Sequence, residues 1–323
     1  MEYIQNFTKP CVLCGQTSTG YKDEFRFYHH TCEQCGDFAV HRDVIDDLLG
    51  TLSDDQKRHL SACTRERKIH GLGKYYLWLG SPKGENIPPN SYTVEYILSR
   101  VFPSRMQDRL DKVLGNLCAL SSTPGQEVEL SYATDLPVLF AESREAGRFV
   151  LDELEDAGYI HTSATSDSLD AIVRGRGIAR MQELEQEAGR LESSQAFVAM
   201  WFDPSMNDAF DLGIGPALED CGFTAIRVDR TDHANKICDE VVAQIRKSRF
   251  IVVDVTDQRQ AVYFEAGFAL GLDIPIIWTC RDDKDLKLCF DTRQYPHILW
   301  LTPDDLRQQL THRVRALVPG AKR

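Results

Sequence analysis

Two short apolar runs flank a helix-sized segment in residues 250–278, and this pattern constrains the fold more than any other in the chain. The first run, 250–253, is rich in β-branched residues and ends at the carboxylate of Asp254, as a strand buried on both faces does. The middle segment has small residues and one carboxylate, Glu265, and a second apolar run follows at 274–278. The pattern therefore predicts a βαβ unit of a parallel sheet.

Three carboxylates are expected at or just beyond the carboxyl end of the first of these strands, namely Asp254, Asp257 and Glu265. In open parallel sheets the ligand crevice lies at that end. A carboxylate in an otherwise apolar helix is costly unless it is paired, hydrogen-bonded or needed for chemistry. The spacing leaves two interpretations of Glu265 open, a catalytic group or a structural residue bonded to backbone or an arginine. Asp254 could equally cap a helix.

The motif 262–268, with the preceding run 253–256, resembles the segment shared by nucleoside 2-deoxyribosyltransferases and the prokaryotic TIR-like nucleotide hydrolases. The likeness covers residues 196–301. In these families a Glu followed by a small or aliphatic residue and Gly attacks, or stabilises charge at, the anomeric carbon of a ribose. The resemblance implies this role for Glu265. Asp254 and Asp257 fall where the transferases carry an acidic residue that touches the sugar or protonates the base.

Strand-sized apolar runs alternate with helix-sized segments through residues 193–323, which predicts a doubly wound parallel α/β sheet of flavodoxin-like order. No GxGxxG motif follows the first of these runs, and no P-loop is present. The domain is therefore not expected to bind a dinucleotide in the manner of an ordinary Rossmann domain.

Six further residues near the expected strand ends are candidates for binding a nucleotide. The two aromatic residues could stack on a base or pack at a domain interface. The histidine and asparagine precede a helix whose amino terminus could receive a phosphate. The two arginines could contact further phosphates, although ion pairs with nearby aspartates explain them at least as well. These six residues are Trp201, Phe202, His233, Asn235, Arg281 and Arg293.

Two CxxC pairs near the amino terminus, with 17 residues between the inner cysteines, predict a structural metal site. A glycine follows each pair and lets the backbone turn so that its amides face the thiolates. Four thiolates in tetrahedral geometry suit structural Zn²⁺, and they leave no position for a reactive water. We therefore expect a zinc-binding module over residues 1–50, with the ligands Cys11, Cys14, Cys32 and Cys35.

A mainly helical domain is expected over residues 51–192. A helical period runs through 38–68, where Ser53 and Gln56 resemble a capping box, and 71–90 is expected to be a loop. The elements expected after this loop resemble those of a winged-helix domain. They are helices at 93–101 and 104–120, a helix pair at 137–140 and 143–157 with Phe149 facing inward, two short strands within 159–173, and a helix at 174–187. The segment 102–193 has 9 Lys and Arg against 17 Asp and Glu, so nucleic acid is a disfavoured partner.

Composition favours a soluble cytoplasmic protein. Mean hydropathy is -0.33, no apolar run is long enough for a membrane span, and the first ten residues do not resemble a signal peptide. Six of the ten cysteines are scattered, which fits a reducing cytosol better than a disulfide framework.

The resemblance implies an N-glycosidase that cleaves NAD⁺ or a related nucleotide, with NAD⁺ as substrate rather than cofactor. TIR-like effectors of this kind often act in bacterial defence against phage, and their sites are often completed by a second chain, so a homo-oligomer is expected. Three alternatives stay open: deoxyribonucleoside base exchange, nucleotide sensing without cleavage, and, least favoured, transcription regulation.

Overall fold

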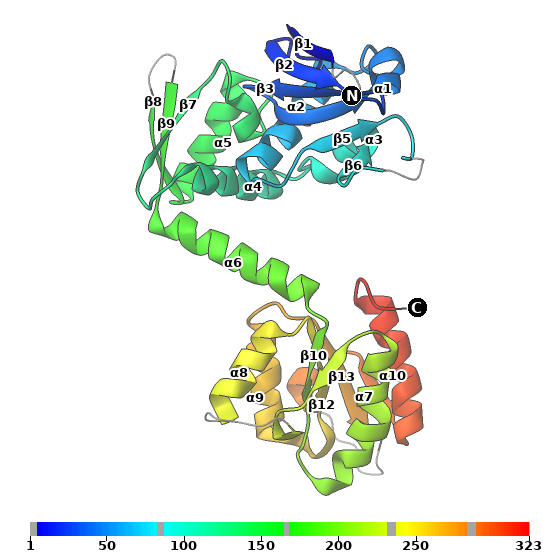
Figure 1. The fold of residues 1–323 in the computed structure, drawn as a ribbon. Coiled ribbons are helices and arrows are strands. Elements are labelled where there is room, and N and C mark those ends of the chain that lie inside the picture. The colour runs from blue at the N-terminus through cyan, green and yellow to red at the C-terminus, as the bar shows by residue number, and fades with distance from the viewer. Residues whose placement is uncertain (1–4, 83–86, 165–167, 231–236, 283–288, 323) are drawn as a thin grey trace. The chain divides into compact units, whose positions relative to one another are not determined.

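The computed structural model describes residues 5–82, 87–164, 168–230, 237–282 and 289–322 (Figure 1). They form two compact units, Met1–Glu183 and Leu184–Arg323. The predicted boundary at residue 50 falls inside the first unit, and the one at residue 192 falls at the end of helix α6 (Gly175–Glu192), which begins in the first unit. None of the helices in these ranges combines the length and the apolar character that a membrane span needs.

The first unit contains a six-stranded sheet whose strands lie side by side in chain order. Strands β1 to β4 are antiparallel, whereas β5 runs parallel to β4 and β6 parallel to β5. The strands are β1 (Gln5–Pro10), β2 (Thr17–Lys22), β3 (Phe27–Cys32), β4 (Gly36–His41), β5 (Tyr75–Trp78) and β6 (Ser91–Thr93).

Two of these strands correct the sequence prediction. The helical period was expected to begin at residue 38, but residues up to His41 belong to β4, because the second CxxC pair forms a tight hairpin turn. Gly36 adopts a φ of 78°, and the chain returns beside β3 with Cys32 opposite Gly36. Strand β5 occupies part of the predicted loop 71–90, because its alternate side chains are buried against the core.

The helices of this unit agree better with prediction. Helix α2 (Asp54–Ile69) follows α1 (Arg42–Asp47) and opens with the predicted capping box of Ser53 and Gln56. Phe149 was expected to face inward, but it is 49% exposed. The remaining helical elements are α3 (Val94–Tyr96), the π-helical turn η1 (Ile97–Val101), α4 (Met106–Leu120), the 3-10 turn η2 (Leu136–Leu139) and α5 (Arg144–Asp156).

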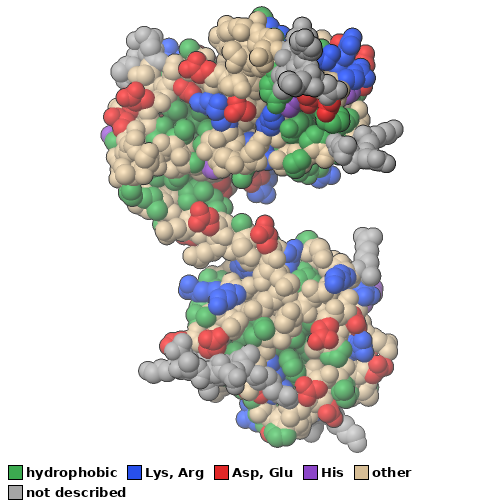
Figure 2. Space-filling model, viewed as in Figure 1, with side chains coloured by type: hydrophobic (Ala, Val, Ile, Leu, Met, Phe, Trp, Pro, Cys, Tyr) green, Lys and Arg blue, Asp and Glu red, His purple; other side chains and the backbone are tan. Residues whose placement is uncertain are grey.

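A second, antiparallel sheet in the first unit has the order β7-β9-β8. The two predicted wing strands are β8 (Ile160–Ala164) and β9 (Ser168–Val173), and β7 (Glu127–Ser131) adds a strand that the sequence pattern did not indicate. On the visible face of this unit, Asp and Glu side chains lie among the Lys and Arg side chains (Figure 2).

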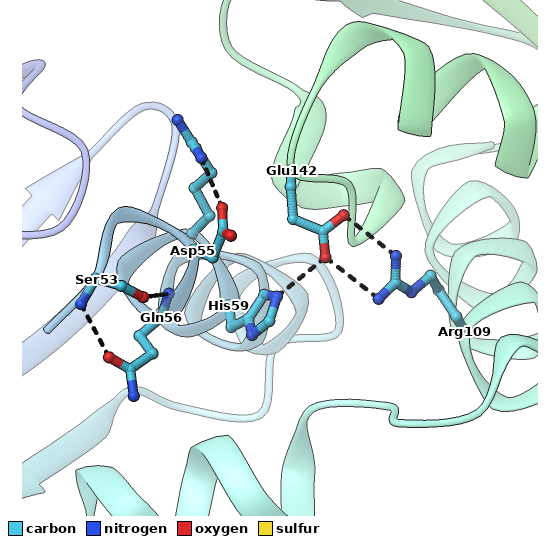
Figure 3. A network of polar contacts seen from close by, with 7 residues as sticks. Ser53, Asp55, Gln56, His59, Arg109 and Glu142 are labelled. Atoms are coloured by element: carbon cyan, nitrogen blue, oxygen red, sulfur yellow. Dashed lines mark hydrogen bonds and ion pairs between the residues drawn. The ribbon is translucent and has the colours of Figure 1, made fainter.

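A polar network joins α2, α4 and the residues before α5 (Figure 3). The Glu142 carboxylate lies 3.0 Å from Nε2 of His59 and accepts two hydrogen bonds of 3.3 Å from Arg109. The hydrogen bond from His59 holds the pKa of Glu142 at about 2. One continuous hydrophobic core extends from Cys11 to Val173, so the cysteine-rich region and the helical region share a single core.

The second unit is a five-stranded parallel sheet with the order β11-β10-β12-β13-β14. The chain passes from β10 to its neighbour β11 and then crosses to β12 on the other side of β10. The carboxyl ends of β10 and β12 therefore flank a topological switch point. The strands are β10 (Gln195–Ala199), β11 (Thr224–Ile226), β12 (Phe250–Asp254), β13 (Ile276–Arg281) and β14 (His297–Trp300).

Helices cover both faces of this sheet (Figure 1). One face packs against the π-helical turn η4 (Ala209–Ile214), α7 (Gly215–Asp220) and α10 (Pro303–Leu317). The other face packs against α8 (Ile237–Lys247) and α9 (Gln260–Leu270). All five residues of β12 are buried, as expected for a central strand with helices on both sides.

Candidate functional site

Helix α9 places Glu265 in the interior of the second unit. The buried residues of α9 are Val262, Glu265, Ala266 and Ala269, which recur at the spacing of one helical face. This face packs against β10, β12 and β13. Glu265 is 7% exposed, so its carboxyl group occupies a position where the fold would ordinarily place an apolar side chain.

The Glu265 carboxyl group has neither an ion pair nor a hydrogen bond with any residue in the described ranges. Burial alone accordingly raises its pKa to about 7. The structural interpretation, a carboxylate bonded to backbone or to an arginine, therefore finds no support among these residues. A carboxyl group that titrates near neutral pH can serve as a nucleophile, a general base or a general acid.

Asp254 is buried as well, but its hydrogen bonds are satisfied. One carboxylate oxygen accepts a hydrogen bond of 3.0 Å from the backbone N–H of Thr256. The other accepts hydrogen bonds from Oγ1 of Thr279 at 2.7 Å and from Nε1 of Trp300 at 2.9 Å. Burial raises the pKa of Asp254, and these donors oppose the rise. The residue joins the carboxyl ends of β12, β13 and β14, and its side chain is fully enclosed.

Asp257 lies in a strained loop between β12 and α9. Asp257 and Gln258 have φ values of 62° and 50°, a region that non-glycine residues occupy rarely. The Asp257 carboxylate pairs with Nη2 of Arg259 at 2.5 Å, and the Arg259 guanidinium lies 3.9 Å from the centre of the Trp201 ring. Arg259 thus brings Asp257 and Trp201, two of the predicted site residues, to one place.

Arg281 lies near the same edge of the sheet. Its backbone N–H donates to Oγ1 of Thr256 at 2.9 Å, and Nη1 lies 3.9 Å from the sulfur of Met206. Arg293 is exposed at the end of the 3-10 turn η7 (Phe290–Thr292). The predicted residues His233 and Asn235 lie outside the described residues.

Two arginines of this edge were not singled out from the sequence. Arg259 has the contacts given above, and Arg227 follows β11 with only 2% of its surface exposed. The Arg227 guanidinium lies 5.4 Å from the centre of the Phe202 ring, and Phe202 itself is 42% exposed. The position of Arg227 directly after an apolar strand was the available signal, but burial of so large a cation is not visible in the sequence.

The four cysteines of the two CxxC pairs converge in the first unit, and their sulfur atoms all lie within 4.8 Å of one another. The sulfurs of Cys11 and Cys35 are 3.7 Å apart, and those of Cys14 and Cys32 are 3.5 Å apart. Four ligands about 2.3 Å from a central ion in tetrahedral geometry are about 3.8 Å from each other. The cluster is therefore compatible with a metal site.

Helix α2 supports this cluster from outside. Oγ of Ser61 donates to the sulfur of Cys35 at 3.1 Å, and Oγ1 of Thr64 donates to the carbonyl oxygen of Cys35 at 2.7 Å. Hydrogen bonds of this kind orient metal ligands. A Cβ atom at Gly36 would lie 3.0 Å from Cβ of Lys68, so the turn also needs glycine to approach α2.

Two cavities lined by described residues lie away from the carboxyl ends of the strands in the second unit. A cavity of about 330 Å³ lies at the opposite, amino-terminal ends of β13 and β14, where Pro275 and Tyr295 line it. Another, of about 290 Å³, lies beside Cys14 in the first unit. We place the candidate site at the carboxyl strand ends because the strained loop and the stacked arginine lie there, at the start of the helix that carries Glu265.

Comparison with protein-family models found no match, and comparison with curated proteins found none either.

The unpaired state of Glu265 predicts an unusual effect of Glu265→Gln on stability. Between pH 4.5 and about 7 the folded state holds a proton that the unfolded state has lost, so the stability of wild type falls as pH rises through this window. Since one pKa unit corresponds to about 1.4 kcal/mol, Glu265→Gln should stabilise the second unit by up to about 3 kcal/mol at pH 8 and have little effect at pH 4. Hydrogen exchange of the β12 amides measures this stability.

Glu219→Gln is the matched control, because Glu219 is an exposed glutamate of the same unit. It should leave exchange unchanged at both pH values. Destabilisation by Glu265→Gln at pH 8 would mean instead that the ionised group has a stabilising partner.

The cysteine cluster yields a second prediction. Cys11→Ser together with Cys35→Ser should release about one metal ion per chain and speed amide exchange in β3 and β4, while exchange in β12 stays unchanged. Elemental analysis identifies the ion. Cys118→Ser, in the same unit but outside the cluster, serves as the control. Wild type without bound metal would contradict the prediction.

Proposed function

We propose that the second unit cleaves the N-glycosidic bond of a nucleotide, with Glu265 acting at the anomeric carbon of the sugar. The observation that carries the proposal is a buried carboxyl group that has no partner among the described residues and a pKa of about 7. A protein retains so costly a group where chemistry uses it. The helix that carries Glu265 begins beside the switch point, where ligands of open parallel sheets bind.

Glycosidic cleavage makes use of such a group. As the bond between C1′ and the base nitrogen breaks, its electron pair leaves with the base and positive charge builds up on the sugar. An ionised Glu265 stabilises this charge or captures C1′ covalently, as carboxylates do in glycoside hydrolysis. Water then supplies hydroxide to C1′. With NAD⁺ as the substrate, neutral nicotinamide leaves and the remaining proton of water goes to solvent.

Other features of the second unit support this proposal. Numbered along the chain, the strand order is 2-1-3-4-5, which supports a flavodoxin-like arrangement. Trp201 and Phe202 follow the first strand of this sheet, with the exposed Phe202 ring available to stack on a base. Asp254 fixes three strand ends and so positions the loop that leads into α9.

The first unit has a structural role in this proposal. We propose Zn²⁺ as the ion of the cysteine cluster, because four thiolates leave no open position for a reactive water. We further propose that the segment from α4 to β9 is winged-helix-like and serves as a scaffold. Its helix α5, together with the residue two positions before it, has too few positive charges to bind nucleic acid. The acidic residues are Glu142, Glu145, Asp152, Glu153, Glu155 and Asp156, and the basic ones are Arg144 and Arg148.

The proposal predicts release of a free base. Incubation of the full chain with NAD⁺, common nucleotides and nucleosides, followed by chromatography, should reveal a freed base with at least one nucleotide. Glu265→Gln should lower the rate at least about 100-fold, because the amide cannot ionise, whereas Glu219→Gln should retain the rate. An added acceptor base that yields a new nucleoside would assign base exchange instead of hydrolysis.

The same reaction should depend on pH. If ionised Glu265 is the reacting form, kcat/KM rises as pH increases through about 7 and then levels off. Full activity of folded Glu265→Gln against every nucleotide cleaved by wild type would refute the proposal.

A further inference from the structure

Arg227 is the largest fully buried side chain in the described part of the protein. A guanidinium group stays charged at all physiological pH values, so its burial is costly unless its donors are satisfied. The second unit therefore maintains a fixed cation in its interior, one residue beyond the end of β11.

The described contacts satisfy this cation only in part. Nη1 donates to Oδ1 of Asn207 at 3.2 Å. Nε lies 2.8 Å from Oδ1 of Asp229, but its hydrogen does not point along this line, so the contact is an ion pair without a hydrogen bond. Nη2 has no hydrogen-bonding partner among the described residues. Of the five N–H donors of a guanidinium, most are therefore left for another acceptor.

Two aromatic rings lie near this guanidinium. Phe202 and Phe210 lie 5.4 Å and 5.3 Å from its central carbon, measured to their ring centres. Aromatic rings do not accept the in-plane hydrogen bonds that the remaining N–H donors can make. A planar guanidinium with donors left over suits the oxygens of a phosphate group.

A second arginine, Arg259, contacts the loop after β10 that also contacts Arg227. Trp201 and Phe202 are consecutive residues after β10, and each carries a guanidinium group against its ring, Arg259 at 3.9 Å and Arg227 at 5.4 Å. The two cations come from different strand ends, β11 and the loop after β12. Within the described residues, the ion-pair partners are Asp229 for Arg227 and Asp257 for Arg259, and Asp203 is a further carboxylate near Arg259.

We infer that Arg227 and Arg259 bind a phosphate group of the substrate, so that this site takes nucleoside phosphates in preference to uncharged nucleosides. The inference rests on the proposed function for the identity of the sugar-bearing ligand. It assigns phosphate recognition to two residues that flank Trp201 and Phe202, and it excludes free nucleosides as the preferred substrates.

Isothermal titration calorimetry of the full chain tests this inference, with the four ribonucleoside 5′-monophosphates and their parent nucleosides as probes. Wild type should bind at least one monophosphate at least about tenfold more tightly than its nucleoside, as expected when a phosphate gains charge-assisted hydrogen bonds. Arg259→Gln and Arg227→Lys should each reduce this ratio at least about threefold. The lysine keeps the charge but loses the planar fork.

Arg307→Gln provides the matched control. Arg307 lies on α10 and forms an exposed ion pair with Asp220, so its replacement removes one positive charge from the same unit away from the strand ends. It should leave the ratio unchanged. Because Arg227 is buried, Arg227→Lys requires a check of folding by circular dichroism; if it does not fold, the exposed Arg259 decides the outcome.

Equal affinity of wild type for monophosphates and nucleosides, or an unchanged ratio in folded Arg259→Gln and Arg227→Lys, would overturn the inference. Its failure is distinct from failure of the proposed function. Base release from nucleosides and nucleotides alike, insensitive to both arginines, would leave the glycosidase and remove the phosphate site. Phosphate-dependent binding without any base release would leave the phosphate site and remove the glycosidase.

Discussion

Burial of one carboxyl group without a partner is the constraint on which the interpretation of the second unit depends. Two carboxyl groups lie close in sequence at the junction of β12 and α9, and both are buried, but their surroundings differ. Asp254 receives three hydrogen bonds and holds strand ends together, whereas Glu265 receives none from the described residues. A buried carboxyl group whose hydrogen bonds are satisfied serves the structure, whereas one without a described partner is a candidate for chemistry. The fold tolerates the cost of Glu265 because the apolar residues on the same face of α9 and all of β12 are packed into the core.

The parallel sheet brings the other contributors to the same edge. The loop after β10 supplies Trp201 and Phe202, the loop after β12 supplies Arg259, and the residue after β11 is Arg227. Each aromatic ring lies against one guanidinium group, so base stacking and anion binding can use adjacent positions. In the first unit the cysteine cluster has a different function in the architecture. Its second cysteine pair forms the turn between β3 and β4, and Cys35 is tied to α2 through Ser61 and Thr64, so the cluster and the helix stabilise one another.

Much of this fold could be predicted from local patterns, because strands buried on both faces and capped helices leave clear signals. The βαβ unit, the capping box at Ser53, the paired strands β8 and β9 and the convergence of the four cysteines were all predictable. What could not be predicted depends on contacts between distant parts of the chain. Asp254 is satisfied by Thr279 and Trp300, 25 and 46 residues away, and no pattern around Asp254 indicates those donors. Residues 38–41 fit a helical period, but the cysteine turn pairs them with β3, and tertiary pairing overrides the local preference. The burial of Arg227 likewise depends on Phe202, Phe210 and Asn207, which precede it in other elements.

Under the proposed function, the side chain at position 265 faces the sugar of a bound nucleotide. A crystal structure of Glu265→Gln with a nucleotide that wild type cleaves tests this most directly, because the variant should hold the intact molecule. The account predicts the base near Trp201 and Phe202 and the side-chain amide of residue 265 about 3–4 Å from C1′, the separation of reacting groups before bond formation. A nucleotide bound with its sugar remote from residue 265, or no nucleotide at the carboxyl strand ends at saturating concentration, would contradict it.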